Sequence, residues 1–571
     1  ARGRMPAVVA AALLVMCAPG GGAAAPAADL VLTGGRVWTG DAARPWAEAL
    51  AVHRGRLTYV GDAAGTADLR GPGTRVIDLA GRLVVPGFND AHIHLMSGAL
   101  SLERVDLIED GTVEAVQERI RAFARANPSA PWVLGRGWLY GAFPGGLPTK
   151  EQLDAAVPDR PAYMECYDGH SGWANSKALA AAGITRDTPD TVGGAIVRDP
   201  STGEPTGALK ESAVALVEKV IPAPSVERRY ALLLQALQRL NAQGITSIQD
   251  AGYGLEELGR ELPLLERAVA EGKMTVRLRA AVRLSPTDFG PAIAEARRLA
   301  ARHRGPLLRF GTVKAFVDGV IEAHTAAMLE PYVTAPFGTG APNWEPAALA
   351  RAVTEADAAS LQVYLHAIGD GGVRMAMDAH EAALRANRRP DRRGRIEHIE
   401  TIHPAEYPRF AALGVIASMQ PLHANPDTNN DSVWKKNIGP ERASRGFGWR
   451  AIEKAGGRLV FGSDWPVVTS DVMRGLYVAL TRKTREGLPA GGWLPGQAVS
   501  LESALRHYTS DAAFASFEEG EKGTLAVGRR ADLVVLSRDL FAEPPEAILT
   551  TRPLLTLLEG AVVYQDPGYT P

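Results

Sequence analysis

The most informative stretch of this sequence is Pro86-Gly87-Phe88-Asn89-Asp90-Ala91-His92-Ile93-His94-Leu95. It directly follows Arg82-Leu83-Val84-Val85, a run typical of a buried strand. Alternate residues of an extended chain point to the same side, so His92 and His94 can offer two imidazoles to one cation. Such a histidine pair also occurs on ordinary protein surfaces. Its place just after a buried strand favours a site at the end of a barrel strand.

On both sides of this segment, from about Val84 to Phe514, strand-like and helix-like stretches alternate. Repeated units of this length favour a parallel sheet, and their number predicts an α/β fold of the (β/α)8, TIM-like barrel type. The predicted helices cover Val113–Asn127, Ser225–Gln243, Pro286–Arg304, Pro346–Ala359, Gly371–Ala386 and Leu501–Thr509. The later predicted strands cover Ile245–Gln249, Val276–Val282, Leu308–Val317, Gln362–His366, Arg395–His398, Val415–Met419 and Arg458–Phe461.

Short strands and turns dominate both ends of the chain, at residues 29–83 and 521–571. They predict one composite β-sandwich built from the two ends. Residues 84–520 are assigned to the barrel. Within it, residues 132–209 break the alternation with glycines, prolines and aromatic residues, and we expect them to form an insertion beside the site.

Residues 1–28 have the pattern of a secretory signal peptide: a positive start, a short apolar run and Ala-x-Ala sites. The alternative is a disordered, alanine-rich tail. Lipid attachment at Cys17 is disfavoured because Met16 is larger than the residue that usually precedes a lipidated cysteine. We therefore expect a periplasmic or secreted protein with no stable membrane insertion once the leader is removed, and with Cys166 as its one thiol.

The composition excludes several classes of protein. Hydrophobic residues make up 46% and charged residues 22% of the chain, which argues against disorder, collagen and coiled coil. Lys and Arg number 62 against 64 Asp and Glu, so no basic face is implied and nucleic acid is not expected as a partner. A homodimer is compatible with the sequence.

Four more residues with metal-binding side chains lie in or just after later predicted strands. His366 and His398 each end a strand, Asp464 follows the last one, and Lys314 lies inside another. Each alone has an ordinary explanation, such as a hydrogen-bonded core histidine or an aspartate that caps a helix. Together with the histidine pair they place donors on successive strands of one barrel, a coincidence that is hard to obtain by chance.

These motifs resemble the amidohydrolase superfamily, and most of all its YtcJ-like branch, which is similar to N-substituted formamide deformylases. The resemblance covers nearly all of Asp29 to Tyr564. It rests on residues 86–94, 167–179, 193–207, 313–319, 366–370, 397–398 and 462–466.

The resemblance implies a metal centre: His92 and His94 bind one ion, His366 and His398 bind a second, and Asp464 contacts the first. Lys314 matches a lysine that can be carboxylated to N6-carboxylysine and then bridge two metals. A free ammonium beside a dication is repelled, whereas carboxylation turns it into an anionic ligand. Imidazole and carboxylate donors suit zinc or a similar divalent ion, and both one and two ions remain open.

The implied reaction is hydrolysis of a small-molecule amide, an N-formyl or N-acyl amine, by metal-activated water. Asp464 would carry the water's proton to the leaving nitrogen, or serve only as a ligand. His170 is a candidate for binding the substrate carbonyl or oxyanion. Trp138, Gln420, His423 and Trp465 are candidates for binding the substrate, although loop aromatics also pack under lids.

One position departs from the family pattern. After Asp318-Gly319, relatives usually carry a Ser-Leu-Gly-Ser-Arg-Thr-like run, whereas this chain has Val320-Ile321-Glu322-Ala323-His324-Thr325. His324 replaces the usual arginine, so a permanent charge becomes a titratable one if this residue contacts the substrate. A family substrate therefore cannot simply be transferred to this chain.

Three alternatives remain. A cyclic-amide hydrolase or a deaminase would use the same ligands on the same scaffold. A catalytically silent binding protein could keep the fold, but it need not keep every donor. An enzyme with a cysteine or serine nucleophile is disfavoured because Cys166 and Ser463 lack a motif that would activate them.

Overall fold

The computed structural model describes residues 26–167, 169, 171–191, 194–334, 336, 338–426 and 433–571. Nearly all of the predicted leader, and His170, lie outside the described residues, so the signal peptide and the role of His170 stay predictions. Within the described ranges, no helix combines the length and apolar character that crossing a membrane requires.

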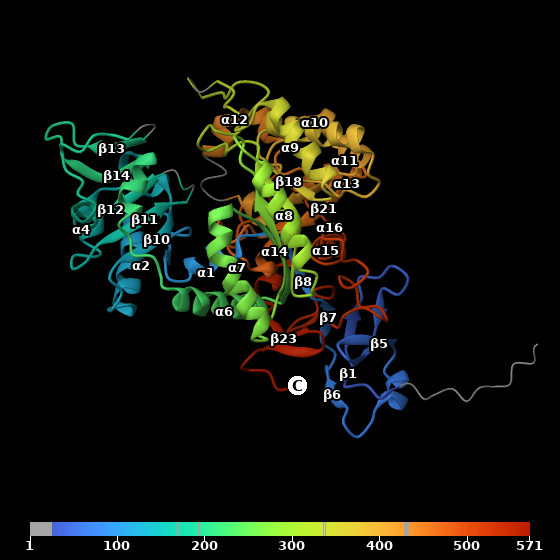
Figure 1. The fold of residues 1–571 in the computed structure, drawn as a ribbon. Coiled ribbons are helices and arrows are strands. Elements are labelled where there is room, and N and C mark those ends of the chain that lie inside the picture. Colours follow the sequence, from blue (N-terminus) through green and yellow to red (C-terminus); the bar gives the residue numbers. More distant parts are fainter. Residues whose placement is uncertain are drawn as a thin grey trace, which may run out of the picture.

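An eight-stranded parallel sheet forms the centre of the molecule, in the order β21-β20-β19-β18-β17-β16-β15-β8 (Figure 1). Its strands are β8 (Phe88–Ile93), β15 (Ile245–Tyr253), β16 (Arg277–Arg283), β17 (Leu308–Phe316), β18 (Gln362–Ala367), β19 (Arg395–His398), β20 (Ile416–Met419) and β21 (Arg458–Phe461). The first and last strands, β8 and β21, lie in contact, so the sheet is nearly closed. The prediction of a TIM-like barrel is confirmed.

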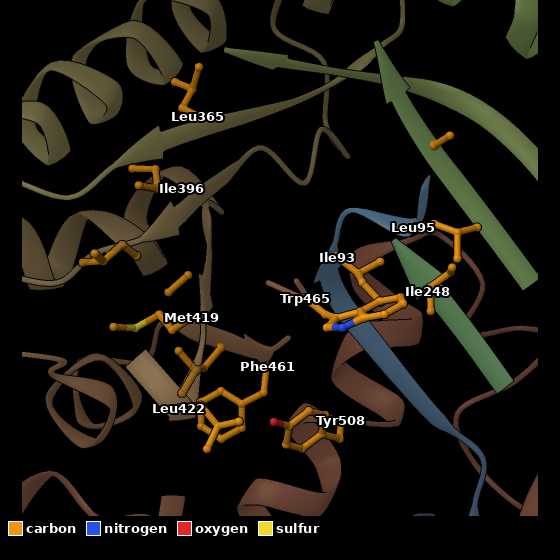
Figure 2. Packing of buried hydrophobic residues seen from close by; sticks show 14 of the residues in the cluster. Ile93, Leu95, Ile248, Leu365, Ile396, Met419, Leu422, Phe461, Trp465 and Tyr508 are labelled. Carbon is orange, nitrogen blue, oxygen red and sulfur yellow. The ribbon is translucent and has the colours of Figure 1, made fainter. Parts of the chain in front are cut away.

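Amphipathic helices surround this sheet. In α6 (Val226–Ala242) the buried residues Leu233, Ala236, Leu237 and Leu240 recur every three or four positions, and Ser225 Oγ caps the helix by accepting from Arg228 N at 3.2 Å. The other barrel helices are α7 (Leu255–Ala270), α8 (Gly290–Arg302), α9 (Pro346–Ala358), α10 (Asp370–Asn387), α11 (Tyr407–Leu413), α12 (Lys435–Ala443), α13 (Trp449–Lys454), α14 (Val472–Thr481), α15 (Leu501–His507) and α16 (Ser510–Ala515). Helices and strands share one large hydrophobic cluster, part of which Figure 2 shows.

The two ends of the chain meet in one sheet below the barrel. Strand β7 (Leu83–Pro86) pairs in parallel with β2 (Arg36–Trp38) and antiparallel with β22 (Leu533–Leu536). This six-stranded sheet also contains β3 (Trp46–Ala47), β23 (Pro553–Leu558) and β24 (Ala561–Gln565). A four-stranded sheet of β1 (Leu30–Thr33), β4 (Ala49–His53), β5 (Arg56–Gly61) and β6 (Arg75–Asp78) shares a hydrophobic cluster with it.

Between α1 (Leu95–Ser101) and α6 the chain leaves the barrel and builds a separate sheet beside it (Figure 1). Its order is β13-β14-β12-β11-β10-β9. The strands are β9 (Val105–Asp106), β10 (Val133–Trp138), β11 (Ala162–Cys166), β12 (Ser171–Ala174), β13 (Gly194–Arg198) and β14 (Pro205–Glu211), accompanied by α2 (Val113–Ala126), α3 (Lys150–Asp154), α4 (Ser176–Ala181) and α5 (Ala215–Glu218). From β10, Arg136 donates to the carbonyl of Pro466, in the loop that follows β21.

Candidate metal centre

The seam between β8 and the loop after β21 fixes the backbone of the site. Asp464 N donates to His92 O at 2.7 Å, and His94 N donates to Trp465 O at 2.9 Å. Gly462 precedes these contacts, and a Cβ on it would lie 2.4 Å from His92 N. The glycine of the Gly-Ser-Asp motif is therefore needed for the close approach that brings Asp464 beside the histidine pair.

A carboxylate holds the same seam from inside. Asp90 Oδ1 accepts hydrogen bonds from His92 N at 3.1 Å and from Ser463 N at 2.9 Å, so one side chain ties β8 to the loop of Asp464. The side chain is completely buried. The sequence predicts no role for Asp90, because the sequence alone does not show which chain segment its side chain faces.

The predicted metal ligands come together at the carboxyl ends of the strands. His92, His398 and Asp464 are buried, and one potential ligand atom of each lies within 4.8 Å of those of the other two. Asp464 Oδ1 is 3.4 Å from His92 Nε2 and 3.2 Å from His94 Nε2. The ring of His366 lies next to that of His398, with centroids 4.5 Å apart.

The chemistry of these atoms fits a cation. Among the described residues, His92 Nε2, His366 Nδ1 and Lys314 Nζ are buried and make no hydrogen bond. Buried polar atoms normally have a partner, because leaving one unpaired costs about 1–3 kcal/mol. The other nitrogen of each histidine is hydrogen-bonded: His92 Nδ1 to Glu397 Oε2 at 2.5 Å, and His366 Nε2 to Gly319 O at 3.2 Å. In each ring, the nitrogen that is hydrogen-bonded leaves the other nitrogen available to bind a cation.

Burial also prepares the protonation states that metal binding requires. Burial, with Lys314 nearby, lowers the pKa of His92 to about 4 and that of His366 to about 3. Burial lowers the pKa of the Lys314 ammonium to about 8. Burial alone would raise the pKa of Asp464, but the surrounding histidines, led by His92, hold it well below its usual range. The site therefore presents neutral imidazoles and one carboxylate anion.

Two of the candidate ligands adopt a backbone conformation that residues other than glycine rarely take. His398 has a φ of 77° and Asp464 a φ of 62°, both in the left-handed region. Such a conformation costs on the order of 1–3 kcal/mol per residue and persists only where the surroundings enforce it. Because both candidate ligands adopt this conformation, we infer that the site requires their side chains to point in specific directions.

Gln420 and His423 also lie at the site. Gln420 Oε1 accepts from His398 Nδ1 at 2.9 Å, which leaves His398 Nε2 available for a metal. His423 stacks on His398 with ring centroids 5.8 Å apart, and its Nε2 lies 3.4 Å from Asp464 Oδ2. Their contact with a substrate stays a prediction.

The side chains of the two candidate tryptophans lie in hydrophobic clusters. Trp465 is 4% exposed and belongs to the same large cluster as Ile93, Leu95 and Ile248 (Figure 2). Trp138 is buried in the cluster of the separate sheet, where its Nε1 donates to Met164 O at 3.0 Å. His324 Nε2 is hydrogen-bonded to Thr334 Oγ1 at 2.9 Å, and the ring of His324 lies 4.9 Å from that of Tyr332, centroid to centroid.

The sequence model described as the amidohydrolase family matches residues 75–564, which is most of the chain. The chain belongs to the amidohydrolase family. This confirms the predicted resemblance and the prediction of an enzyme, of the class that acts on carbon–nitrogen bonds other than peptide bonds.

Two curated relatives match this amidohydrolase over nearly their whole length. Protein LONG AFTER FAR-RED 3 of Arabidopsis thaliana is 34% identical over 90% of this chain and 88% of the relative. The N-substituted formamide deformylase of Arthrobacter pascens is 29% identical over 95% of this chain and 99% of the relative. Among solved structures, an uncharacterized metal-dependent hydrolase from Pyrococcus furiosus matches with a TM-score of 0.68 and 27% identity, covering 90% of this chain and 99% of that one.

Proposed function

We propose that this amidohydrolase hydrolyses a linear amide, an N-formyl or N-acyl amine, with the help of a bound divalent cation. The observation that carries the proposal is the convergence of His92, His398 and Asp464 on one buried point, surrounded by nitrogen atoms that make no hydrogen bond. The similarity to an N-substituted formamide deformylase supports the substrate class.

Zinc is the proposed cation, because neutral imidazoles with a carboxylate are donors it favours. His92 and His94, both near Asp464 Oδ1, would hold one ion with Asp464, and His366 and His398, whose rings are adjacent, would hold a second. The buried trio of His92, His398 and Asp464 contains members of both sets, so the two ions would be close together. We propose that Lys314 is carboxylated, since its buried Nζ makes no hydrogen bond and its lowered pKa leaves part of it as the free amine that reacts with carbon dioxide. A bound cation would lower the pKa of a water molecule and polarise the amide carbonyl.

The chain's own residues supply the proton transfer. Asp464 is held as an anion and directed by its backbone hydrogen bond to His92 O, so it can accept a proton at its carboxylate and return it to the leaving nitrogen. His423, 3.4 Å from Asp464 Oδ2, is placed to touch the same carboxylate or the substrate beside it. Burial of His92, His398 and Asp464 limits their contact with bulk water, which strengthens each of these interactions.

The test compares Asp464→Asn with Asp357→Asn on protein loaded with zinc. Asp357 is also a buried carboxylate, 2% exposed; it lies on the outer helix α9 and pairs with Arg389 and Arg392 in the loop after α10. We expect Asp464→Asn to abolish release of formate or acetate from N-formyl and N-acetyl amines, and Asp357→Asn to retain it. Near-normal turnover by Asp464→Asn would remove this residue from the mechanism.

The same screen separates the alternatives. Hydrolysis of cyclic amides alone would identify the protein as a cyclic-amide hydrolase. Release of ammonia from heteroaromatic amines alone would identify it as a deaminase. If the zinc-loaded protein binds these compounds but turns none of them over, it is a silent binding protein.

We further propose export from the cytoplasm, supported by the signal-peptide pattern of residues 1–28. N-terminal sequencing of secreted or periplasmic protein tests it, and recovery of the protein only in the cytoplasm would contradict it. We also propose that the two terminal sheets form one composite sandwich, supported by their shared hydrophobic cluster. A homodimer is the proposed oligomeric state, for which light scattering is the test.

A further inference from the structure

A buried ion pair between Arg395 and Glu397 contacts the candidate ligand His92 on the side away from the cation site. Glu397 Oε2 accepts from His92 Nδ1 at 2.5 Å, and the Arg395 guanidinium grips both oxygens of Glu397, at 2.8 Å from Nε to Oε1 and 2.9 Å from Nη2 to Oε2. All three side chains have no exposed surface. Ile396 between them packs into the hydrophobic cluster (Figure 2), so Arg395 and Glu397 face the opposite side, the barrel interior.

Arg395 also reaches across the barrel. Its Nη2 donates to the carbonyl of Ala91 at 2.6 Å and to Ser418 Oγ at 2.8 Å, and its Nη1 donates to Gln249 Oε1 at 2.5 Å. Ala91 is the residue before His92 on β8, whereas Arg395 lies on β19, and these strands are not neighbours in the sheet. The pair therefore holds the backbone at Ala91 and the ring of His92 at the same time.

We infer that Arg395 and Glu397 form a cross-barrel brace that fixes the orientation and tautomer of His92 and thereby strengthens cation binding at the site. Glu397 and Arg395 are positioning residues: they act through His92 and contact neither substrate nor cation. The inference rests on the proposed metal-dependent function and adds to it a determinant of metal affinity.

The physical reason is the two-sided nature of imidazole. With Nδ1–H donating to Glu397, the lone pair of His92 is on Nε2, the atom that lies 3.4 Å from Asp464 Oδ1. Without the carboxylate, the ring can place its proton on either nitrogen and can rotate. Removing a hydrogen-bonding partner behind a metal-bound histidine typically weakens metal affinity by about 10–100-fold.

The experiment measures cobalt(II) affinity of the chelator-stripped full chain, by competition with a chromophoric chelator, together with the cobalt absorption spectrum. The decisive variant is the double substitution Arg395→Met with Glu397→Leu, because removing Glu397 alone would leave a buried, unpaired guanidinium. Glu397→Gln is the conservative variant, since its amide oxygen can still accept from His92 Nδ1. Glu406→Gln is the matched control: Glu406 is 2% exposed, directly precedes α11, and pairs with Arg374 of α10 at 2.7 Å and with Arg409 of α11 at 2.8 Å.

We expect the double variant to bind cobalt about 10–100-fold more weakly, with an altered spectrum, Glu397→Gln to lie in between, and Glu406→Gln to match the parent. A folded double variant with the parent's affinity and spectrum would overturn the inference while leaving the proposed function intact. If the double variant does not fold, Glu397→Gln decides, and an affinity equal to the parent's overturns the inference. A parent chain that binds no cobalt would refute the proposed function itself, and the inference with it.

Discussion

The position of Gly98 allows the packing behind Asp464 to be tested by adding a single methyl group. Gly98 lies inside α1, where a Cβ would sit 2.3 Å from two ring carbons of Trp465. Trp465 follows Asp464 in the chain, and its carbonyl accepts from His94 N at 2.9 Å. Because carbon atoms pack at about 3.5–4.0 Å, the indole must move by roughly 1 Å or more to admit the methyl group.

The matched variant is Gly259→Ala. Gly259 lies inside α7, and nothing is within 4 Å of the Cβ that it would gain. Both substitutions gain about 1 kcal/mol of helix propensity. Only Gly98→Ala also incurs the cost of overpacking, about 1–3 kcal/mol, so the two variants should differ by that amount in their free energy of unfolding.

Urea titration followed by tryptophan fluorescence measures this difference. We expect Gly259→Ala to be more stable than the parent and Gly98→Ala to be the less stable of the two. Because Trp465 follows Asp464 in the chain and its carbonyl accepts from His94 N, displacing Trp465 in Gly98→Ala should also weaken cobalt binding, while Gly259→Ala should not. Equal free energies of unfolding for the two variants would refute the packing that places Trp465 against α1.

Two further predictions concern charge. Lys314→Ala should lower the metal bound per chain in elemental analysis and abolish any gain in metal uptake from added bicarbonate; parent-like values in both would refute a carboxylated bridge. His507 is buried between Glu453 and Asp511, each 3.0 Å away, and although burial lowers its pKa, these carboxylates raise it above the usual value. The stability that His507 contributes is fully present below its unfolded pKa of about 6.5 and is lost as pH rises through the higher folded value. The advantage of the parent over His507→Asn in urea unfolding should therefore shrink as pH rises above about 6.5, and a pH-independent difference would contradict this.

The barrel could be predicted because its signals are local. Strand β19 was predicted with its observed ends, Arg395–His398, and each end of α6 lies one residue inside its predicted end, because apolar runs and helical periodicity depend on neighbouring residues. The sheet beside the barrel was not predicted. Its strands β11 and β12 pair antiparallel while β10 and β11 pair in parallel, and short strands rich in glycine show no period that reveals such pairing.

The candidate donors could be proposed for the same reason, since each lies within or just after a strand whose apolar run is visible. The surroundings of the aromatic loop residues could not be predicted from the sequence. A tryptophan in a loop with proline gives the same local signal whether it lines a pocket or fills a core. The indole of Trp465 fits against α1 because Gly98 has no side chain there. Residues distant in sequence thus decided the place of Trp465.

Arg395 and Glu397 show why a charged pair in a strand can be misjudged. Two charges at alternate positions favour a solvated face in sequence, yet both are fully buried in the barrel interior. A buried ion pair is often no more stabilising than apolar residues of the same shape, because desolvation of the charges offsets their attraction. If this pair contributed mainly stability, its replacement by Met and Leu should lower the free energy of unfolding and leave cobalt affinity unchanged. If the pair instead holds His92, the same replacement should leave unfolding close to the parent and weaken cobalt binding, so the two measurements on one variant separate the two explanations.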